Sequence, residues 1–306
     1  MLIYFITCLI LAILFGGAYY AYRIAFYSPS KGREKIPSTQ GSQYDPYRQE
    51  MKRLFHQLQD RPCEFVTTQS HDGLTLSGRY YHVADGAPVD IGFHGYRSSP
   101  MTDFTGGSDL SIRLGHNVLL IDHRAHGKSQ GRTITFGIKE RRDLLQWVNY
   151  AIDRFGKDVK IVLYGISMGG ATVLMASELE LPENVKGIIA DCPYSSPLDI
   201  ILNVGKNMPI PNWLIKPFAK LGARIYGGFD LEEASAAQAV RKAKVPILII
   251  HGESDHLVPC SMSDLVSENP DKITRFTFPN ANHGLSYLED TARYQKIVME
   301  FLEKIL

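Results

Sequence analysis

Residues 160–179 read KIVLYGISMGGATVLMASEL, and this stretch decides the fold. Its first five residues form a short apolar run, which is typical of a strand buried on both faces. The pentapeptide Gly165–Gly169 follows, and small residues then open a helical pattern over Met168–Leu179. Gly-x-Ser-x-Gly between a strand and a helix predicts a sharp turn, where the glycines relieve backbone crowding around the serine. A chance match among 26 glycines is the alternative. We take Ser167 as the candidate nucleophile.

Short apolar runs alternate with helical patterns along most of the chain. The clearest helical pattern is Gly137–Phe155, whose apolar residues fall on one broad face. Such alternation predicts an α/β fold with a mostly parallel central sheet flanked by helices. The expected strands are a β pair at Glu64–Thr68 and Thr75–His82, then Val89–His94, Val118–Asp122, Lys160–Tyr164, Val185–Ala190, Ile247–His251 and Thr274–Phe278.

Three segments lie outside this alternation. Residues 197–240 are rich in proline and aromatic residues and fall between two expected strands, so we expect a small helical lid inserted into a catalytic domain of residues 62–306. Residues 28–61 begin polar, with several prolines and glycines, and end in an amphipathic stretch near Tyr47–Leu58. We interpret them as a linker followed by one leading helix.

The N-terminal segment is apolar enough to enter a membrane. Residues 2–22 carry no charged side chain and approach the roughly 20 residues that cross a hydrocarbon layer as a helix. We therefore expect residues 1–27 to form a single-pass transmembrane anchor. A cleaved signal peptide, with Gly16–Ala18 as its cleavage site, and a buried core helix are the alternatives. No Lys or Arg precedes the apolar run, and Tyr19, Tyr20 and Tyr22 resemble an interfacial aromatic belt, so both observations favour the anchor.

Positive charge after the apolar run predicts the orientation. Arg23, Lys31, Arg33 and Lys35 follow it closely, and positive residues favour the cytoplasmic side of a membrane. We expect an outside N-terminus and a cytoplasmic catalytic domain; a secreted or extracellular-facing domain is the alternative.

The overall charge and the cysteines restrict the partners. Thirty-three basic and 32 acidic residues give a formal charge of +1, so no global field recruits nucleic acid, and we expect a small-molecule substrate. The four cysteines, Cys8, Cys63, Cys192 and Cys260, show no CxxC spacing. They predict neither a disulfide framework nor a zinc site, and we expect no cofactor and no metal.

A nucleophilic serine needs a general base and an acid that orients the base. After such a turn these partners follow in the order acid, then histidine. His283 lies after the last expected strand, and Asp255 follows the strand before it, 28 residues earlier. An ordinary loop histidine and a turn or helix-cap aspartate are the bland alternatives. Asp191, after the preceding strand, is a competing candidate for the acid.

Acyl transfer also needs donors for the negative charge that develops on the carbonyl oxygen. One expected donor is the backbone N–H of Met168, directly after the nucleophile. The other should come from the loop His94–Ser99, where Gly95 permits a close approach and the backbone N–H of Tyr96 is our candidate. An ordinary turn is the alternative at this loop.

Together these features resemble the α/β-hydrolase superfamily, from about Cys63 to the C-terminus. Residues 122–131, DHRAHGKSQG, look like the family's D-x-R-x-x-G-x-S-x-G loop, and residues 251–259 are similar to the segment that carries the family's acid. The likeness is greatest to prolyl-oligopeptidase-like and serine-aminopeptidase-like members with membrane-anchored relatives, which implies esterase, lipase-like or peptidase activity. The oxyanion loop departs from the HGGG of some lipases. His123 and His126 fall within the matched loop and lack a convincing third metal ligand.

The sequence thus predicts a serine hydrolase that cleaves carboxylic esters, with Ser167, Asp255 and His283 as catalytic residues. The substrate would be a small ester, lipid esters included, and residues 2–22 would contact the membrane. One alternative is a serine peptidase or aminopeptidase that acts on amides of short peptides. Glu232 and Glu233 could hold its free amine, although a solvated helix face is the favoured interpretation of both. Another is a catalytically silent binding protein on the same fold.

Overall fold

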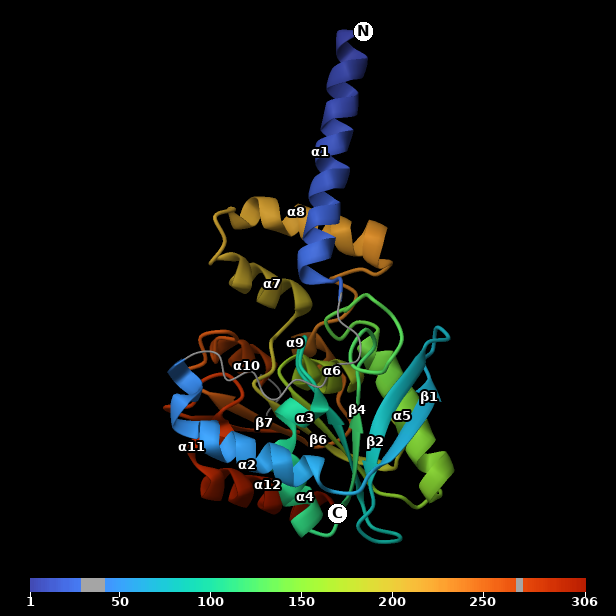
Figure 1. The fold of residues 1–306 in the computed structure, drawn as a ribbon, viewed down its shortest axis with the longest axis vertical. Helices are drawn as coiled ribbons and strands as arrows, with labels where there is room; N and C mark the ends of the chain where they lie inside the picture. Colours follow the sequence, from blue (N-terminus) through green and yellow to red (C-terminus); the bar gives the residue numbers. More distant parts are fainter. Residues whose placement is uncertain (29–41, 268–271) are drawn as a thin grey trace.

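The computed structural model describes residues 1–28, 42–267 and 272–306 (Figure 1). Most of the predicted linker, with Lys31, Arg33 and Lys35, lies outside the described residues. Within them, a 3₁₀ turn at Ser42–Tyr47 leads into helix α2, Arg48–Gln59, so a helix lies where the leading helix was expected. Phe55 and Leu58 of α2 are buried against the rest of the protein.

A mixed sheet forms the centre of the described chain. Its strand order is β1-β2-β4-β3-β5-β6-β7-β8, in which β1, β2 and β4 pair antiparallel and all other pairs are parallel. The predicted, mostly parallel sheet is therefore confirmed, and each expected strand is present within one or two residues. The strands are β1 Glu64–Gln69, β2 Thr75–Tyr81, β3 Val89–Phe93, β4 Asn117–Ile121, β5 Ile161–Ile166, β6 Val185–Asp191, β7 Ile247–Gly252 and β8 Ile273–Phe278.

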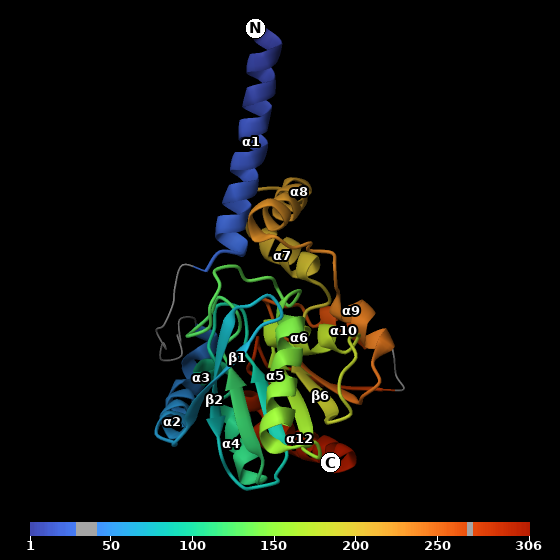
Figure 2. The same ribbon diagram turned by 90° about the vertical axis from the view of Figure 1, so that its right-hand side faces the viewer.

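Helices cover both faces of the sheet (Figures 1 and 2). Strand β4 contributes side chains to the apolar clusters on both faces of the sheet. Leu119 and Ile121 join one cluster, while Val118 and Leu120 join the other. The period of two along a strand sends alternate side chains to opposite faces. The first cluster includes residues of α5, Glu140–Phe155, and α6, Met168–Ala176; the second includes residues of α3, Pro100–Asp103, α4, Thr105–Arg113, and α12, Thr291–Ile305.

Residues 197–240 are helical, as the sequence predicts. They form α7, Pro197–Gly205, α8, Asn212–Gly222, a π-helical turn at Ala223–Gly227 and α9, Ala236–Ala239. Helix α8 crosses the lower part of α1, Leu2–Ala25 (Figure 1). The helices touch closely, since a Cβ atom on Gly222 would lie 2.5 Å from the carbonyl oxygen of Ala18. On the side of α1, a Cβ on Gly17 would meet the Phe218 ring at the same distance.

Helix α1 projects from the body and is long and apolar enough to cross a membrane. Its last turn is held by the loop that follows β3. The hydroxyl of Tyr96 donates to the carbonyl of Ala25 at 2.8 Å, and Arg97 Nη2 donates to the carbonyls of Ile24 and Tyr27 at 2.7 and 3.0 Å. These contacts satisfy carbonyls at a helix end, where intrahelical donors are missing. They also join α1 to the predicted oxyanion loop.

Candidate active site

Ser167 lies on a strained turn between β5 and α6. Its φ is 55°, a region that few residues other than glycine adopt. A Cβ on Gly165 would lie 2.2 Å from the carbonyl oxygen of Gly169, and a Cβ on Gly169 would lie 1.7 Å from that of Phe93. Neither position can carry a side chain without moving backbone. The turn therefore needs glycine on both sides of the serine.

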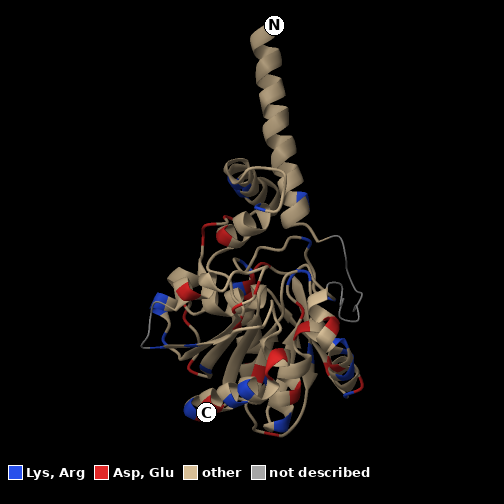
Figure 3. Cartoon of the chain, turned by 90° about the vertical axis from the view of Figure 1, so that its left-hand side faces the viewer, with Lys and Arg blue, Asp and Glu red and all other residues tan. Residues whose placement is uncertain are grey.

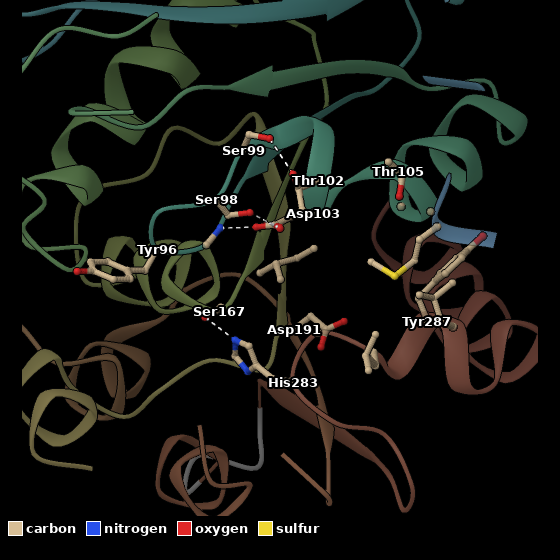
Figure 4. Close-up of a pocket in the computed structure, with 18 of the residues that line it drawn as sticks. Tyr96, Ser98, Ser99, Thr102, Asp103, Thr105, Ser167, Asp191, His283 and Tyr287 are labelled. Carbon is tan, nitrogen blue, oxygen red and sulfur yellow. Dashed lines mark hydrogen bonds between the residues drawn. The ribbon is translucent and has the colours of Figure 1, made fainter. Parts of the chain in front are cut away.

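Ser167, His283 and Asp255 form one chain of hydrogen bonds. His283 Nε2 lies 2.9 Å from Ser167 Oγ (Figure 4), and His283 Nδ1 lies 2.6 Å from Asp255 Oδ2. The two partners come from loops after β8 and β7, which are parallel neighbours, so both loops reach the same edge of the sheet. With Nδ1–H donating to the carboxylate, Nε2 is free to accept the serine proton.

The carboxyl group of Asp255 is fully buried yet well supplied with donors. Its Oδ1 accepts hydrogen bonds from the backbone N–H groups of Leu257 and Val258 at 2.9 and 2.8 Å. Burial alone would raise the pKa of Asp255, but the hydrogen bonds from His251 and His283 hold it well below its ordinary value. Asp255 is therefore ionised at neutral pH and can orient His283.

Asp191, the competing acid, has a different partner. Its Oδ2 accepts a hydrogen bond from the Tyr294 hydroxyl at 2.9 Å, and the Tyr294 hydroxyl also pairs with that of Tyr164. Among the described residues, Asp191 Oδ1 has no hydrogen-bond partner. Burial raises the pKa of Asp191 to about 6, against the effect of the Tyr294 hydrogen bond. It is Asp255, and not Asp191, that contacts the imidazole of His283.

Two backbone N–H groups next to Ser167 are available to an oxyanion. Within the described parts of the chain, neither the N–H of Met168 nor that of Tyr96 donates to a protein acceptor. The loop comes close to the serine, since a Cβ on Gly95 would lie 3.4 Å from Ser167 Cβ. The Gly95 N–H itself donates to Asp103 Oδ2 at 2.7 Å, which leaves Tyr96 as the free donor.

Buried histidines support this loop, a role that the sequence did not predict. His126 Nε2 accepts from the backbone N–H of Arg97 at 3.0 Å, while its Nδ1 donates to the Arg124 carbonyl. His94 Nδ1 bonds the Gly95 carbonyl at 2.8 Å. Burial lowers the pKa of both histidines, so each remains neutral, as these bonds require. The sequence signals for this role were the His94-Gly95 pair, which contains His94, and the D-x-R-x-x-G motif, which contains His126.

A cavity of about 600 Å³ adjoins Ser167 and His283 (Figure 4). Its wall includes residues of the leading segment, namely Tyr44, Met51 and Leu54, and Tyr287 from α11, Ser286–Glu289. Residues 197–240, all of which the structure describes, contribute nothing to this wall. The expected lid therefore does not shape this cavity.

The glutamates offered for an aminopeptidase lie elsewhere. Glu232 pairs with Lys220, and Glu233 pairs with Arg142 at 2.5 Å and with Arg141 at 3.2 Å. Neither glutamate lines the cavity. Both side chains lie in partly exposed ion pairs outside the cavity, which agrees with the solvated interpretation and not with the binding of a substrate amine in this cavity.

Two clusters of described residues have the ligand types for a metal ion. One consists of Cys192, Asp255 and His283, where Asp255 and His283 already bond to each other. The other consists of His71, Asp72 and Asp143, whose two carboxylates both bind Arg124 at 2.6–2.9 Å. A guanidinium thus supplies the positive charge there.

Comparisons with known proteins agree with this architecture. A family model described as "alpha/beta hydrolase fold" matches residues 104–224. The chain is 26% identical to the uncharacterized protein YqkD of Bacillus subtilis (strain 168) over 98% of this chain and 96% of that one. It is also 26% identical to the uncharacterized membrane protein YNL320W of Saccharomyces cerevisiae, over 62% of each chain.

Solved structures support the same fold. The esterase Pf2001 of Pyrococcus furiosus superposes with a TM-score of 0.65 at 23% identity, covering 81% of this chain and 95% of that one. An acylaminoacyl peptidase of Pyrococcus horikoshii gives a TM-score of 0.63 at 18% identity, covering 83% and 43%. The predicted α/β-hydrolase fold is confirmed.

The environment of Asp191 predicts a pH-dependent stability. Because its pKa is higher in the folded chain than the ordinary 3.8, ionisation disfavours the folded state as pH rises through about 4 to 6, whereas both states are protonated below this range. Asp191→Asn is neutral throughout and keeps an acceptor for Tyr294. Relative to wild type, the free energy of unfolding of this variant should rise by up to about 3 kcal/mol between pH 4 and pH 8. Chemical unfolding at each pH measures it.

The matched control is Asp153→Asn, at an exposed position of α5, measured over the same pH range. The change with pH in the free energy of unfolding, relative to wild type, should be larger for Asp191→Asn than for this control. A pH-independent difference for Asp191→Asn would contradict the assignment of a raised pKa.

Proposed function

We propose that this chain, which has the α/β-hydrolase fold, is a serine hydrolase that cleaves carboxylic esters through an acyl-enzyme intermediate. The observation that carries the proposal is the hydrogen-bonded chain from Asp255 through His283 to Ser167. A serine hydroxyl is a weak nucleophile, and a base at hydrogen-bond distance, itself held by a carboxylate, activates it.

The reaction would proceed in two steps. His283 Nε2 takes the Ser167 proton as Oγ attacks the ester carbonyl carbon, and the imidazolium then returns that proton to the leaving alcohol. Water next gives a proton to His283 and attacks the acyl carbon, which releases the carboxylic acid and restores Ser167. The buried carboxylate of Asp255 stabilises the imidazolium in both steps.

The N–H groups of Tyr96 and Met168 would hold the oxyanion in each tetrahedral intermediate. Removing one such donor costs about 3–4 kcal/mol of transition-state stabilisation in other enzymes. Asp103, His94 and His126 support the proposal, because their hydrogen bonds to the loop after β3 keep its backbone in one conformation.

The two glutamates considered for binding a free amine lie outside the cavity, which favours esters over the substrates of an aminopeptidase. Glu232 and Glu233 are paired with basic side chains instead. Peptide hydrolysis stays as the second candidate, since the nucleophile, base and acid serve both reactions. Parallel rates on short-chain p-nitrophenyl esters and aminoacyl amides separate the two.

We further propose that α1 is a retained single-pass anchor, with the catalytic domain on the cytoplasmic side. Cleavage at Gly16–Ala18 would remove residues that pack on α8, including the fully buried Ala18. Retention of α1 therefore agrees with its contacts better than a signal peptide does. Arg23 at the base of α1 supports the orientation through the positive-inside rule.

Labelling by a fluorophosphonate probe tests the nucleophile. Wild type should react at Ser167, because His283 activates that hydroxyl, and Ser167→Ala should not react. Ser261→Ala removes an exposed serine outside the cavity and should label like wild type. Equal labelling of wild type and Ser167→Ala would refute the assignment.

A pair of asparagine variants tests the acid. Asp255→Asn should lower kcat by roughly 10³–10⁴-fold, since the amide no longer holds His283 in the productive tautomer. Asp191→Asn should keep kcat within a fewfold of wild type, because Asp191 bonds Tyr294 and not His283. The reverse pattern would make Asp191 the acid.

The contact between α1 and the oxyanion loop predicts an effect on turnover. Tyr96→Phe removes the hydrogen bond to the Ala25 carbonyl while keeping the backbone N–H. One such bond is worth about 1 kcal/mol, so the loosened loop should lower kcat on a water-soluble ester by at most roughly fivefold, with KM little changed. Tyr226→Phe is the control, because its hydroxyl bonds the Phe15 carbonyl of α1, away from the loop. Equal effects of both variants would show a purely structural role.

A further inference from the structure

Helices α7 and α8 present apolar side chains to solvent next to α1. Trp213 is 74% exposed, and Val204, Ile210 and Ile225 are each at least 36% exposed. The two prolines 209 and 211 flank Ile210 at the tip between the helices. Exposed apolar side chains that gather at one site of a protein indicate a contact surface. We call residues 204–225 the hairpin.

The charge of the hairpin is of one sign. Between Ile200 and Phe229 the sequence contains Lys206, Lys216, Lys220 and Arg224 but no aspartate or glutamate. Lys220 is partly neutralised by Glu232, which lies outside this stretch. Figure 3 shows basic residues on α8 beside the uncharged length of α1. A partner that complements this surface must be both apolar and anionic.

On α8, the exposed tryptophan and basic side chains lie on a different side from the residues that pack against the protein. Ala219 and Gly222 are buried, and Gly222 lies against α1. Trp213, Lys216, Lys220 and Arg224 recur at helical spacing along another side of the helix. Tryptophan and basic side chains together on one exposed side of α8 and of the π-helical turn after it are typical of surfaces that lie in the headgroup region of a bilayer.

The height at which α8 crosses α1 fits a bilayer surface. Gly222 contacts Ala18 and Tyr22, and Phe218 contacts Gly17, so the crossing covers residues 17–22 of α1. The same level carries Tyr19, Tyr20 and Tyr22, and the first charged residue, Arg23, follows at once. Aromatic belts and the first basic residue mark the boundary between hydrocarbon and headgroups. With α1 as the proposed anchor, α8 is level with that boundary.

We propose that the hairpin is a second membrane contact, which lies in the headgroup region of an anionic bilayer beside α1. Trp213 and Ile210 reach the acyl boundary, and the four basic side chains lie among lipid phosphates. This inference rests on the proposed anchor, not on the hydrolase activity. It makes the body bind the membrane through two crossed helices rather than through one flexible tether.

The two tryptophans of the chain allow a direct test. Trp147 is fully buried in the body, while Trp213 is exposed on α8. The full-length protein is reconstituted into vesicles of phosphatidylcholine and phosphatidylglycerol with brominated acyl chains. We expect loss of most of the Trp213 emission, whereas Trp213→Phe, which reports Trp147 alone, should not be quenched.

Other outcomes overturn the proposal. Quenching of Trp213 by aqueous iodide but not by brominated lipid would place it in water. Quenching by neither would mean that protein, such as a second copy, covers it. Flotation of the vesicles separates this failure from failure of the anchor, since a chain that does not float with lipid lacks the anchor itself.

Charge variants test the anionic part of the claim. Lys216→Gln combined with Arg224→Gln should lessen the difference in Trp213 quenching between vesicles with and without phosphatidylglycerol. Lys296→Gln, an exposed lysine of α12, is the matched control and should leave that difference unchanged. If the double variant showed the same difference in Trp213 quenching as Lys296→Gln, a role for anionic lipid would be refuted.

Discussion

Crowding of backbone around Ser167 is the constraint on which the site depends. Gly169 packs directly on the carbonyl of Phe93 at the end of β3, and the Ser167 N–H bonds the carbonyl of Asp191 at the end of β6 at 2.8 Å. The turn is thus clamped between the two strands that flank β5. Its positive φ is sustained by these contacts, as strained residues at functional sites generally are. The loops that follow β3, β7 and β8 then meet at this serine, because all three strands end at the same edge of the sheet.

Most of the fold could be predicted from local patterns. Strands buried on both faces appear as continuous apolar runs, so β3 to β7 were bounded within one or two residues. Ser167, Asp255 and His283 follow a chain order that the fold imposes, and the structure brings all three together. The strand positions and the proximity of these three residues could be predicted because each depends on residues close in sequence or on a fixed topology.

Contacts between distant segments could not be predicted in this way. The roles of His94 and His126 depend on which backbone groups they meet, and a buried neutral histidine looks like any other histidine in a sequence. Residues 197–240 were expected to form a lid, yet none of them lines the cavity, and α8 packs on α1 instead. Their prolines and aromatic residues indicated an irregular helical insertion but carried no information about its partner.

The composition of the cavity wall has a consequence for how such a protein changes over evolutionary time. Tyr44, Met51 and Leu54 shape the cavity from one segment, whereas the helices beside α1 come from another that does not touch it. On the proposed function, replacements in the first segment would alter the accepted substrate while leaving the proposed membrane attachment intact. Substrate preference and membrane attachment would therefore diverge independently, because they depend on separate segments of one chain.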